Sequence, residues 1–167
     1  LLAEADDDRL HVDQDVRRAF MHTVRASSPK VLNFLSSVLT QSGNNAVVHE
    51  GIFRCFASWV FWGDISSNTL MDAAPQLVSA TFTALAAPHL FDVAVDAALE
   101  LTRTYDDFRV HGPVCNVLVP GIMAQAPRLR EAIAHGKDRI VTGLTRLVVE
   151  LGFSYMDLIV GGTDMNQ

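Results

Sequence analysis

Histidines and acidic residues are the side chains of this sequence that could support hydrolytic or metal-assisted chemistry. The chain has six histidines and 19 aspartates and glutamates. Two histidines that bind one metal from the same helix face are usually four residues apart. No two histidines here have that spacing, and His89, His111 and His135 each stand beside a proline or glycine. The sequence therefore predicts no metal site.

Adjacent carboxylates occur in two places, at residues 6–8 and at Asp106-Asp107. General acid–base catalysis needs two carboxylates whose pKa values are pushed apart in one cleft. Both runs fall in predicted loops, where carboxylates are ordinarily solvated. The sequence also lacks a Gly-x-Ser-x-Gly motif, a phosphate-binding loop and a Cys-x-x-Cys motif. We therefore expect no catalytic residue, no cofactor and no enzymatic activity.

The composition favours helices that are covered on more than one side. Hydrophobic residues make up 49% and charged residues 19%, against the roughly 25% charged residues of a typical globular domain. The net charge of −6 disfavours direct binding of nucleic acid and favours a basic protein partner. Residues 73–91, one of the two longest stretches without a formal charge, contain two prolines and several hydroxyl side chains, so no membrane span is predicted there.

Apolar residues recur at helical spacing along nearly the whole chain. The predicted helices cover residues 12–26, 30–40, 46–62, 75–86, 89–104, 114–126, 128–134, 139–151 and 153–160. Ser66-Ser67 is expected to begin a short turn, and Pro120-Gly121 to kink or split a helix. The predicted structural core consists of Ile52, Cys55, Phe56, Trp59, Phe82, Phe91, Leu101, Leu118 and Leu147.

The long first helices begin near residues 45, 89 and 137, at intervals of 44 and 48 residues. This period is typical of HEAT and armadillo repeats. The predicted fold is an all-α superhelix (α-α solenoid) of about four antiparallel helix pairs, at residues 12–42, 45–87, 89–127 and 137–162. Residues 1–11 would form an acidic extension or loop, and residues 163–167 a tail. A compact helical bundle is the competing architecture.

Four segments, in order, carry a resemblance to a known family. Residues 55–60 read Cys-Phe-Ala-Ser-Trp-Val, and residues 90–97 read Leu-Phe-Asp-Val-Ala-Val-Asp-Ala. Val-Leu-Val-Pro follows at 117–120, and a helix at 144–152 closes on Leu-Gly. Together they resemble the transportin-SR and importin-thirteen branch of the importin-β (karyopherin-β) superfamily, in its N-terminal half.

The resemblance implies a nuclear transport receptor that shuttles between cytoplasm and nucleus. Its implied partners are protein cargo, including Arg/Ser-rich and other nuclear proteins, and FG-repeat nucleoporins on the outer helices. Ran-GTP would bind through the full-length receptor, because the Ran-contacting repeats of the family lie upstream of the matching segments. From the charge and the composition, neither direct nucleic-acid binding nor a membrane is expected.

Two groups of residues are candidates for these contacts. The nucleoporin groove is expected between adjacent outer helices, at His49, Phe53, Trp62 and Ala94. The second helices of the pairs carry few charges, so basic cargo is expected to meet loop carboxylates, at Asp64, Asp72, Asp106 and Asp107. A constitutive HEAT scaffold and a helical-bundle regulatory domain remain as alternative functions.

Overall fold

The computed structural model describes residues 13–155, and every regular element in that range is an α-helix. The elements are α2 (Gln14–Ala26), α3 (Ser28–Gln41), α4 (Ala46–Trp62), α5 (Ser67–Ala73), α6 (Pro75–Ala84), α7 (Phe91–Thr104), α8 (Phe108–Met123), α9 (Ala126–Ala134) and α10 (Asp138–Ser154). The predicted all-α fold class is confirmed. The predicted residues 1–11, 163–167 and most of 153–160 lie outside the described range.

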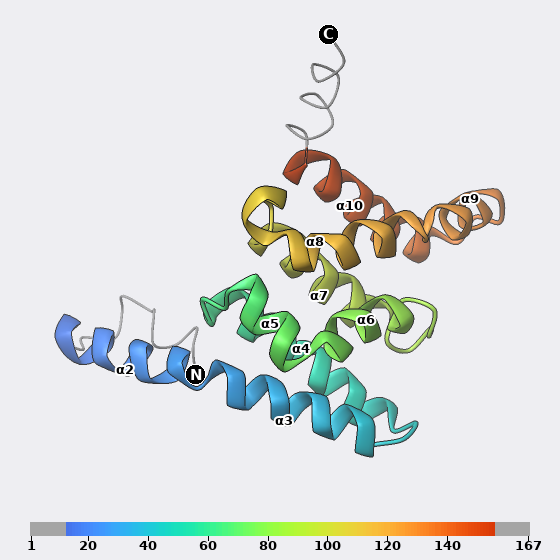
Figure 1. Ribbon diagram of the computed structural model, residues 1–167. Coiled ribbons are helices and arrows are strands. Elements are labelled where there is room, and N and C mark those ends of the chain that lie inside the picture. The colour runs from blue at the N-terminus through green and yellow to red at the C-terminus, as the bar shows by residue number, and fades with distance from the viewer. Residues whose placement is uncertain (1–12, 156–167) are drawn as a thin grey trace, which may run out of the picture.

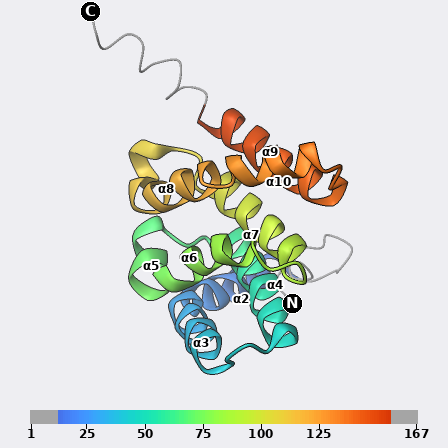
Figure 2. The same cartoon turned by 90° about the vertical axis from the view of Figure 1, so that its right-hand side faces the viewer.

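The helices form two stacked layers (Figures 1 and 2). In the first layer α4 packs on α7, and α7 packs on α10. In the second layer α5 and α6 lie between α3 and α8. The first-layer helices begin at residues 46, 91 and 138, so successive repeats are 45 and 47 residues long. The contacts of each repeat are mainly with its neighbours, which confirms the solenoid and excludes the compact bundle.

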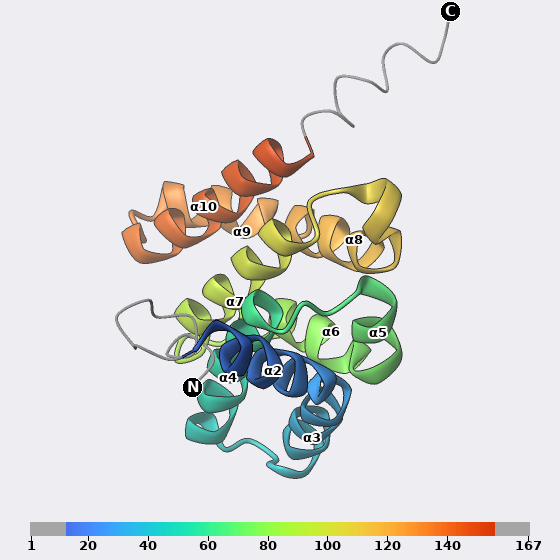
Figure 3. The same cartoon turned by 90° about the vertical axis from the view of Figure 1, so that its left-hand side faces the viewer.

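The N-terminal helices depart from the expected pairing. Only Ser27 separates α2 from α3, and its backbone is close to helical, with φ −86° and ψ −7°. An antiparallel helix pair needs a connection of about two to five residues. Helix α2 therefore leads into α3 end to end and does not fold back on it (Figures 1 and 3). No residue of α2 is buried, which corrects the hairpin expected for residues 12–42.

The other helix ends largely follow from local side-chain chemistry. Asn45 caps α4 by accepting a hydrogen bond from the Val48 amide, and Ser66 caps α5 in the same way from the Thr69 amide. The expected turn at Ser66-Ser67 is thus the start of a short helix. Gly43, with φ +56°, makes the left-handed turn between α3 and α4.

Helix α8 begins earlier than predicted and runs through Pro120. Its only residue outside helical angles is His111, with φ −112° and ψ 23°, just before Gly112 and Pro113. Pro120 cannot donate a hydrogen bond to the carbonyl of Asn116. Both residues are exposed, so water can satisfy that carbonyl and the helix does not split. The kink therefore lies two residues before Pro113 and not at Pro120.

Most of the predicted core residues are buried between the layers. Ile52, Phe56, Phe91, Leu101, Leu118 and Leu147 are buried, whereas Cys55, Trp59 and Phe82 are half-buried. Helices α7 and α10 approach closely because residue 143 is glycine: a Cβ there would lie 2.7 Å from the ring of Phe91. A larger residue at this position would push the two repeats apart.

Two tyrosines link successive repeats at the turns that follow the first-layer helices. The Tyr105 hydroxyl donates to the carbonyl of Ile65 at 2.9 Å, and the Tyr155 hydroxyl donates to the carbonyl of Tyr105 at 2.6 Å. Burial raises the pKa of both phenols. They therefore remain protonated donors at neutral pH, and each bond reaches back about one repeat.

The first prediction concerns this link. Tyr105→Phe keeps the ring but leaves the buried carbonyl of Ile65 without its donor, so the free energy of unfolding should fall by about 1–2 kcal/mol. Urea denaturation of the chain measures this loss. Ser37→Ala is the control, because it removes an exposed hydroxyl that bonds within its own helix and should change stability by less than about 0.5 kcal/mol. Equal effects of the two variants would show that the link contributes nothing.

Candidate functional site: a groove between two first-layer helices

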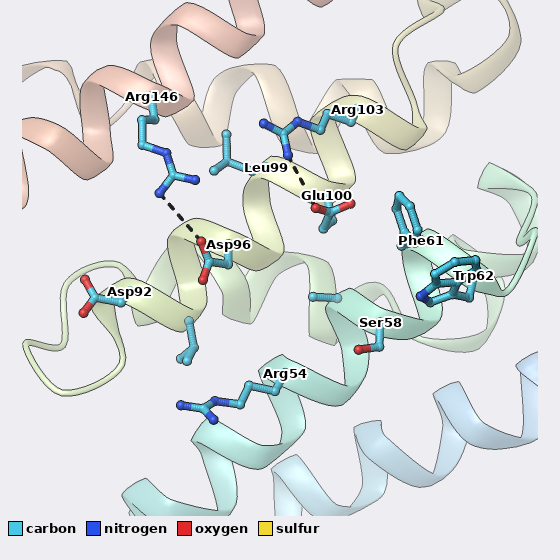
Figure 4. Close-up of a pocket in the computed structure, with 12 residues that line it drawn as sticks. Arg54, Ser58, Phe61, Trp62, Asp92, Asp96, Leu99, Glu100, Arg103 and Arg146 are labelled. Atoms are coloured by element: carbon cyan, nitrogen blue, oxygen red, sulfur yellow. Dashed lines mark ion pairs between the residues drawn. The ribbon is translucent and has the colours of Figure 1, made fainter. Parts of the chain in front are cut away.

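A groove of about 580 Å³ runs between α4 and α7, and we call it the α4–α7 groove (Figure 4). Helix α4 supplies one wall, α7 the other, and α10 adds one side chain. The lining residues are Arg54, Ala57, Ser58, Phe61, Trp62, Asp92, Val93, Asp96, Leu99, Glu100, Arg103 and Arg146. The groove therefore draws on two successive repeats and one residue of a third.

The wall from α4 arises because this helix is covered on two sides and open on a third. Its buried residues, Ile52, Phe53, Phe56 and Val60, face the other helices. Residues 54, 57, 58, 61 and 62 recur at a spacing of three or four and share the remaining face. Phe61 is 58% exposed, and its ring meets that of Trp62 edge to face at 4.7 Å. An aromatic ridge thus closes one end of the groove.

Ion pairs hold α7 to α10 beside the groove. Arg103 contacts Glu150 at 2.9 Å, Arg139 contacts Asp92 at 2.9 Å, and Arg146 contacts Asp96 at 3.8 Å. Figure 4 shows Arg146 reaching from α10 toward Asp96, with Arg103 and Glu100 farther along α7. Within residues 13–155, by contrast, no ion pair joins α4 to α7. The groove thus lies at the α4–α7 interface, which has no ion pair across it among these residues.

Glu100 is the least satisfied acid of the groove. Arg103 lies 3.5 Å from its Oε1 atom, but its Oε2 atom is buried without a hydrogen-bond partner. Burial is the main reason that the pKa of this carboxyl is raised, and the charge of Arg103 opposes the rise. The α7 wall therefore carries a carboxylate that is poorly solvated and only partly neutralised.

A second hollow of about 540 Å³ lies where two turns meet, and we call it the turn hollow. One turn connects α4 to α5 and the other connects α7 to α8. The hollow is lined by Arg25, Val60, Phe61, Asp64, Ile65, Ser66, Thr104, Tyr105 and His111. Phe61 thus lines both the groove and the hollow.

The residues predicted for nucleoporin binding are not brought together. Trp62 lines the α4–α7 groove. Phe53 and Ala94 are only 1% and 0% exposed, because they pack inside the stack, so they are wrong as surface residues. His49 is half-buried, with its Nε2 atom 2.9 Å from the Ser42 hydroxyl, and does not line the groove. Phe61, which also lines the groove, was missed, because two apolar lines run along α4 and the sequence does not show which of its phenylalanines is exposed.

The predicted cargo-binding carboxylates are exposed, and three of them lie in first-layer turns. Asp64 lines the turn hollow. Asp106 and Asp107 occupy the next turn, where Asp107 caps α8 by accepting a hydrogen bond from the Arg109 amide. The bond from Tyr105 to Ile65 places the two turns side by side. Asp72 lies on α5 and lines neither the α4–α7 groove nor the turn hollow.

Over residues 13–155, no cluster of three or more histidine, cysteine or acidic side chains is arranged to bind a metal ion. None of the helices described there combines the length and the apolar character that a membrane span requires.

Comparison with known proteins places the chain in a family. A family model described as exportin 1-like protein matches residues 4–97, more than half of the sequence and the part that includes α4 and the first half of α7. The chain belongs to the exportin 1-like family. Its expected membership of the importin-β superfamily of nuclear transport receptors is thereby confirmed.

Individual relatives of this exportin 1-like chain bear names from the same superfamily. Importin-13 of Gallus gallus is 30% identical over 122 residues, and importin-13 of Homo sapiens is 27% identical over the same length; each match covers 73% of this chain. Transportin MOS14 of Arabidopsis thaliana is 27% identical over 155 residues, which is 90% of this chain. The chain spans only 12 to 15% of the length of these relatives.

The second prediction separates the buried and exposed phenylalanines of α4. Phe53→Ala should lower the free energy of unfolding by about 3–5 kcal/mol, because it opens a cavity in the stack. Phe61→Ala should cost less than about 1 kcal/mol, since its ring is mostly exposed. Chemical denaturation of both variants measures the difference. Similar losses for the two variants would contradict the placement of Phe53 on a buried face of α4 and of Phe61 on its exposed face.

Proposed function

We propose that this chain is a segment of a nuclear transport receptor that moves protein cargo between cytoplasm and nucleus. Membership of the exportin 1-like family supports this, as do relatives named importin and transportin. In this role the chain binds other proteins and catalyses nothing. Ran-GTP controls the full-length receptor through other repeats.

We further propose that the α4–α7 groove binds phenylalanine side chains of FG nucleoporins. The observation that carries this is the groove itself, an open channel between first-layer helices. Ala57, Val93 and Leu99 lie there among charged side chains, and the exposed ring of Phe61 stands at one end. Ala57, Val93 and Leu99 can cover the faces of an inserted phenyl ring. Edge-to-face contact with Phe61 or Trp62 would add about 0.5–1.5 kcal/mol beyond the area buried.

Cargo is proposed to meet the second-layer side and the acidic turns. Helices α3 and α6 carry a single formal charge, Lys30, and expose hydroxyl and amide side chains. Asp64, Asp106 and Asp107 supply negative charge at the edge, which suits a basic or Arg/Ser-rich cargo. Asp72 extends this charge along α5.

The third prediction tests the groove. Binding of a fluorescent Phe-Gly repeat peptide to the 167-residue chain is measured by anisotropy, beside a peptide in which every Phe is Ser. Phe61→Ser should weaken binding of the Phe peptide by about tenfold, as expected for an aromatic interface anchor. Phe34→Ser is the matched control, because Phe34 is 65% exposed but lies on α3 in the other layer.

Two outcomes would contradict the proposal. If both variants bind the Phe peptide equally well, the groove is not the binding site. If the chain and the full-length receptor fail to distinguish the Phe and Ser peptides, nucleoporin recognition is excluded and the constitutive scaffold becomes the better account. An import assay with the full-length receptor then decides whether the protein transports cargo.

A further inference from the structure

The turn hollow and the α4–α7 groove share one wall. Phe61 lines both, with its ring standing edge to face against Trp62 between them. Both cavities are open to the surface and similar in volume, about 580 and 540 Å³. An extended chain that places one side chain in the groove can therefore pass over Phe61 and place a nearby side chain in the hollow.

Polar and apolar residues line the turn hollow in similar measure. The polar ones include Asp64, Ser66, Thr104 and His111. Asp64 is held in the left-handed conformation, with φ +48°, and is the only non-glycine residue with positive φ among those described. Its carboxylate is 79% exposed. The Nδ1 atom of His111 is buried without a hydrogen-bond partner. This wall holds polar groups that the fold itself leaves incompletely paired.

The charges around the hollow favour a cation as its occupant. Arg25 is the nearest internal cation, but it lies 3.8 Å from the Asp64 carboxylate and donates instead to the carbonyl of Trp62 at 3.4 Å. An exposed pair at that distance is weak and readily exchanged. The adjoining turn adds Asp106 and Asp107, against the single cation Arg109. The edge therefore carries negative charge that Arg25 neutralises only in part.

We propose that the turn hollow is a second subsite, which holds a lysine or arginine side chain of the same peptide segment whose phenylalanine occupies the α4–α7 groove. The inference rests on the proposed binding of phenylalanine in that groove, and it adds a preference for a basic residue nearby. An extended chain advances about 3.3 Å per residue. A basic residue two to four positions from the phenylalanine would thus lie roughly 7–13 Å along the chain.

The fourth prediction uses three peptides that are alike except in charge. Each contains one phenylalanine, followed three residues later by Lys, Gln or Glu. The Lys peptide should bind the 167-residue chain about twofold to fivefold more tightly than the Gln peptide at low salt, the range expected of one exposed ion pair. The advantage should shrink as salt is raised, because exposed charges are screened. The Glu peptide should bind most weakly.

Asp64→Asn should remove the difference between the Lys and Gln peptides and leave binding of the Gln peptide unchanged. Asparagine tolerates the left-handed conformation, so this variant keeps the turn. Asp138→Asn is the control: it makes the same change of charge at an exposed residue outside both cavities, and it should keep the preference for lysine.

The two proposals fail in different ways. If no phenylalanine peptide binds, the groove proposal fails and takes the subsite with it. If the Gln peptide binds at the groove and Phe61→Ser weakens it, but lysine adds nothing, only the subsite is refuted. A lysine preference that survives in Asp64→Asn would also refute the subsite and assign the preference to the acids of the groove.

Discussion

The hydrogen bond from the Tyr105 hydroxyl to the carbonyl of Ile65 sets the register of one repeat on the next. It joins the end of α7 to the turn that follows α4, across 40 residues of sequence. Buried in an apolar stack, it cannot be exchanged for water without loss. Since the two helix ends are fixed, the open faces of α4 and α7 come side by side, and so do the turns that carry Asp64 and Asp106. The α4–α7 groove and the turn hollow both depend on that register.

The two first-layer interfaces are built differently, and this explains where the groove lies. Helices α7 and α10 are joined by Gly143 against Phe91 and by three ion pairs. On the groove side, by contrast, Arg54 pairs with Glu50 of its own helix, so nothing charged bridges the gap to α7 among the described residues. Asp92, Asp96, Glu100 and Arg103 of α7 line the groove beside Val93 and Leu99, so the α7 wall of the groove is both charged and apolar.

The sequence was sufficient for the helices, the repeat period and the family, because each of these leaves a local or periodic signal. The sequence did not show which side chains of α4 are buried and which are exposed. Ile52 and Phe53 are adjacent, so two apolar lines run along the helix, and only the packing of α3 and α7 shows that both are buried. The exposed ring is therefore Phe61, which no periodic argument had distinguished from Phe53. The direction of α2 and the unbroken helix at Pro120 likewise depend on a single linker residue and on solvent exposure.

The central claim is that a phenylalanine of a partner binds between α4 and α7. The most direct measurement is photo-crosslinking with a Phe-Gly peptide in which one phenylalanine carries a benzophenone group, followed by mass spectrometry of the crosslinked chain. The account predicts crosslinks concentrated in residues 54–62 and 92–103, and suppressed by an excess of unlabelled Phe peptide but not of the Ser peptide. Specific crosslinks confined to α3, α6 and α8 would place the binding site on the opposite layer and contradict the claim.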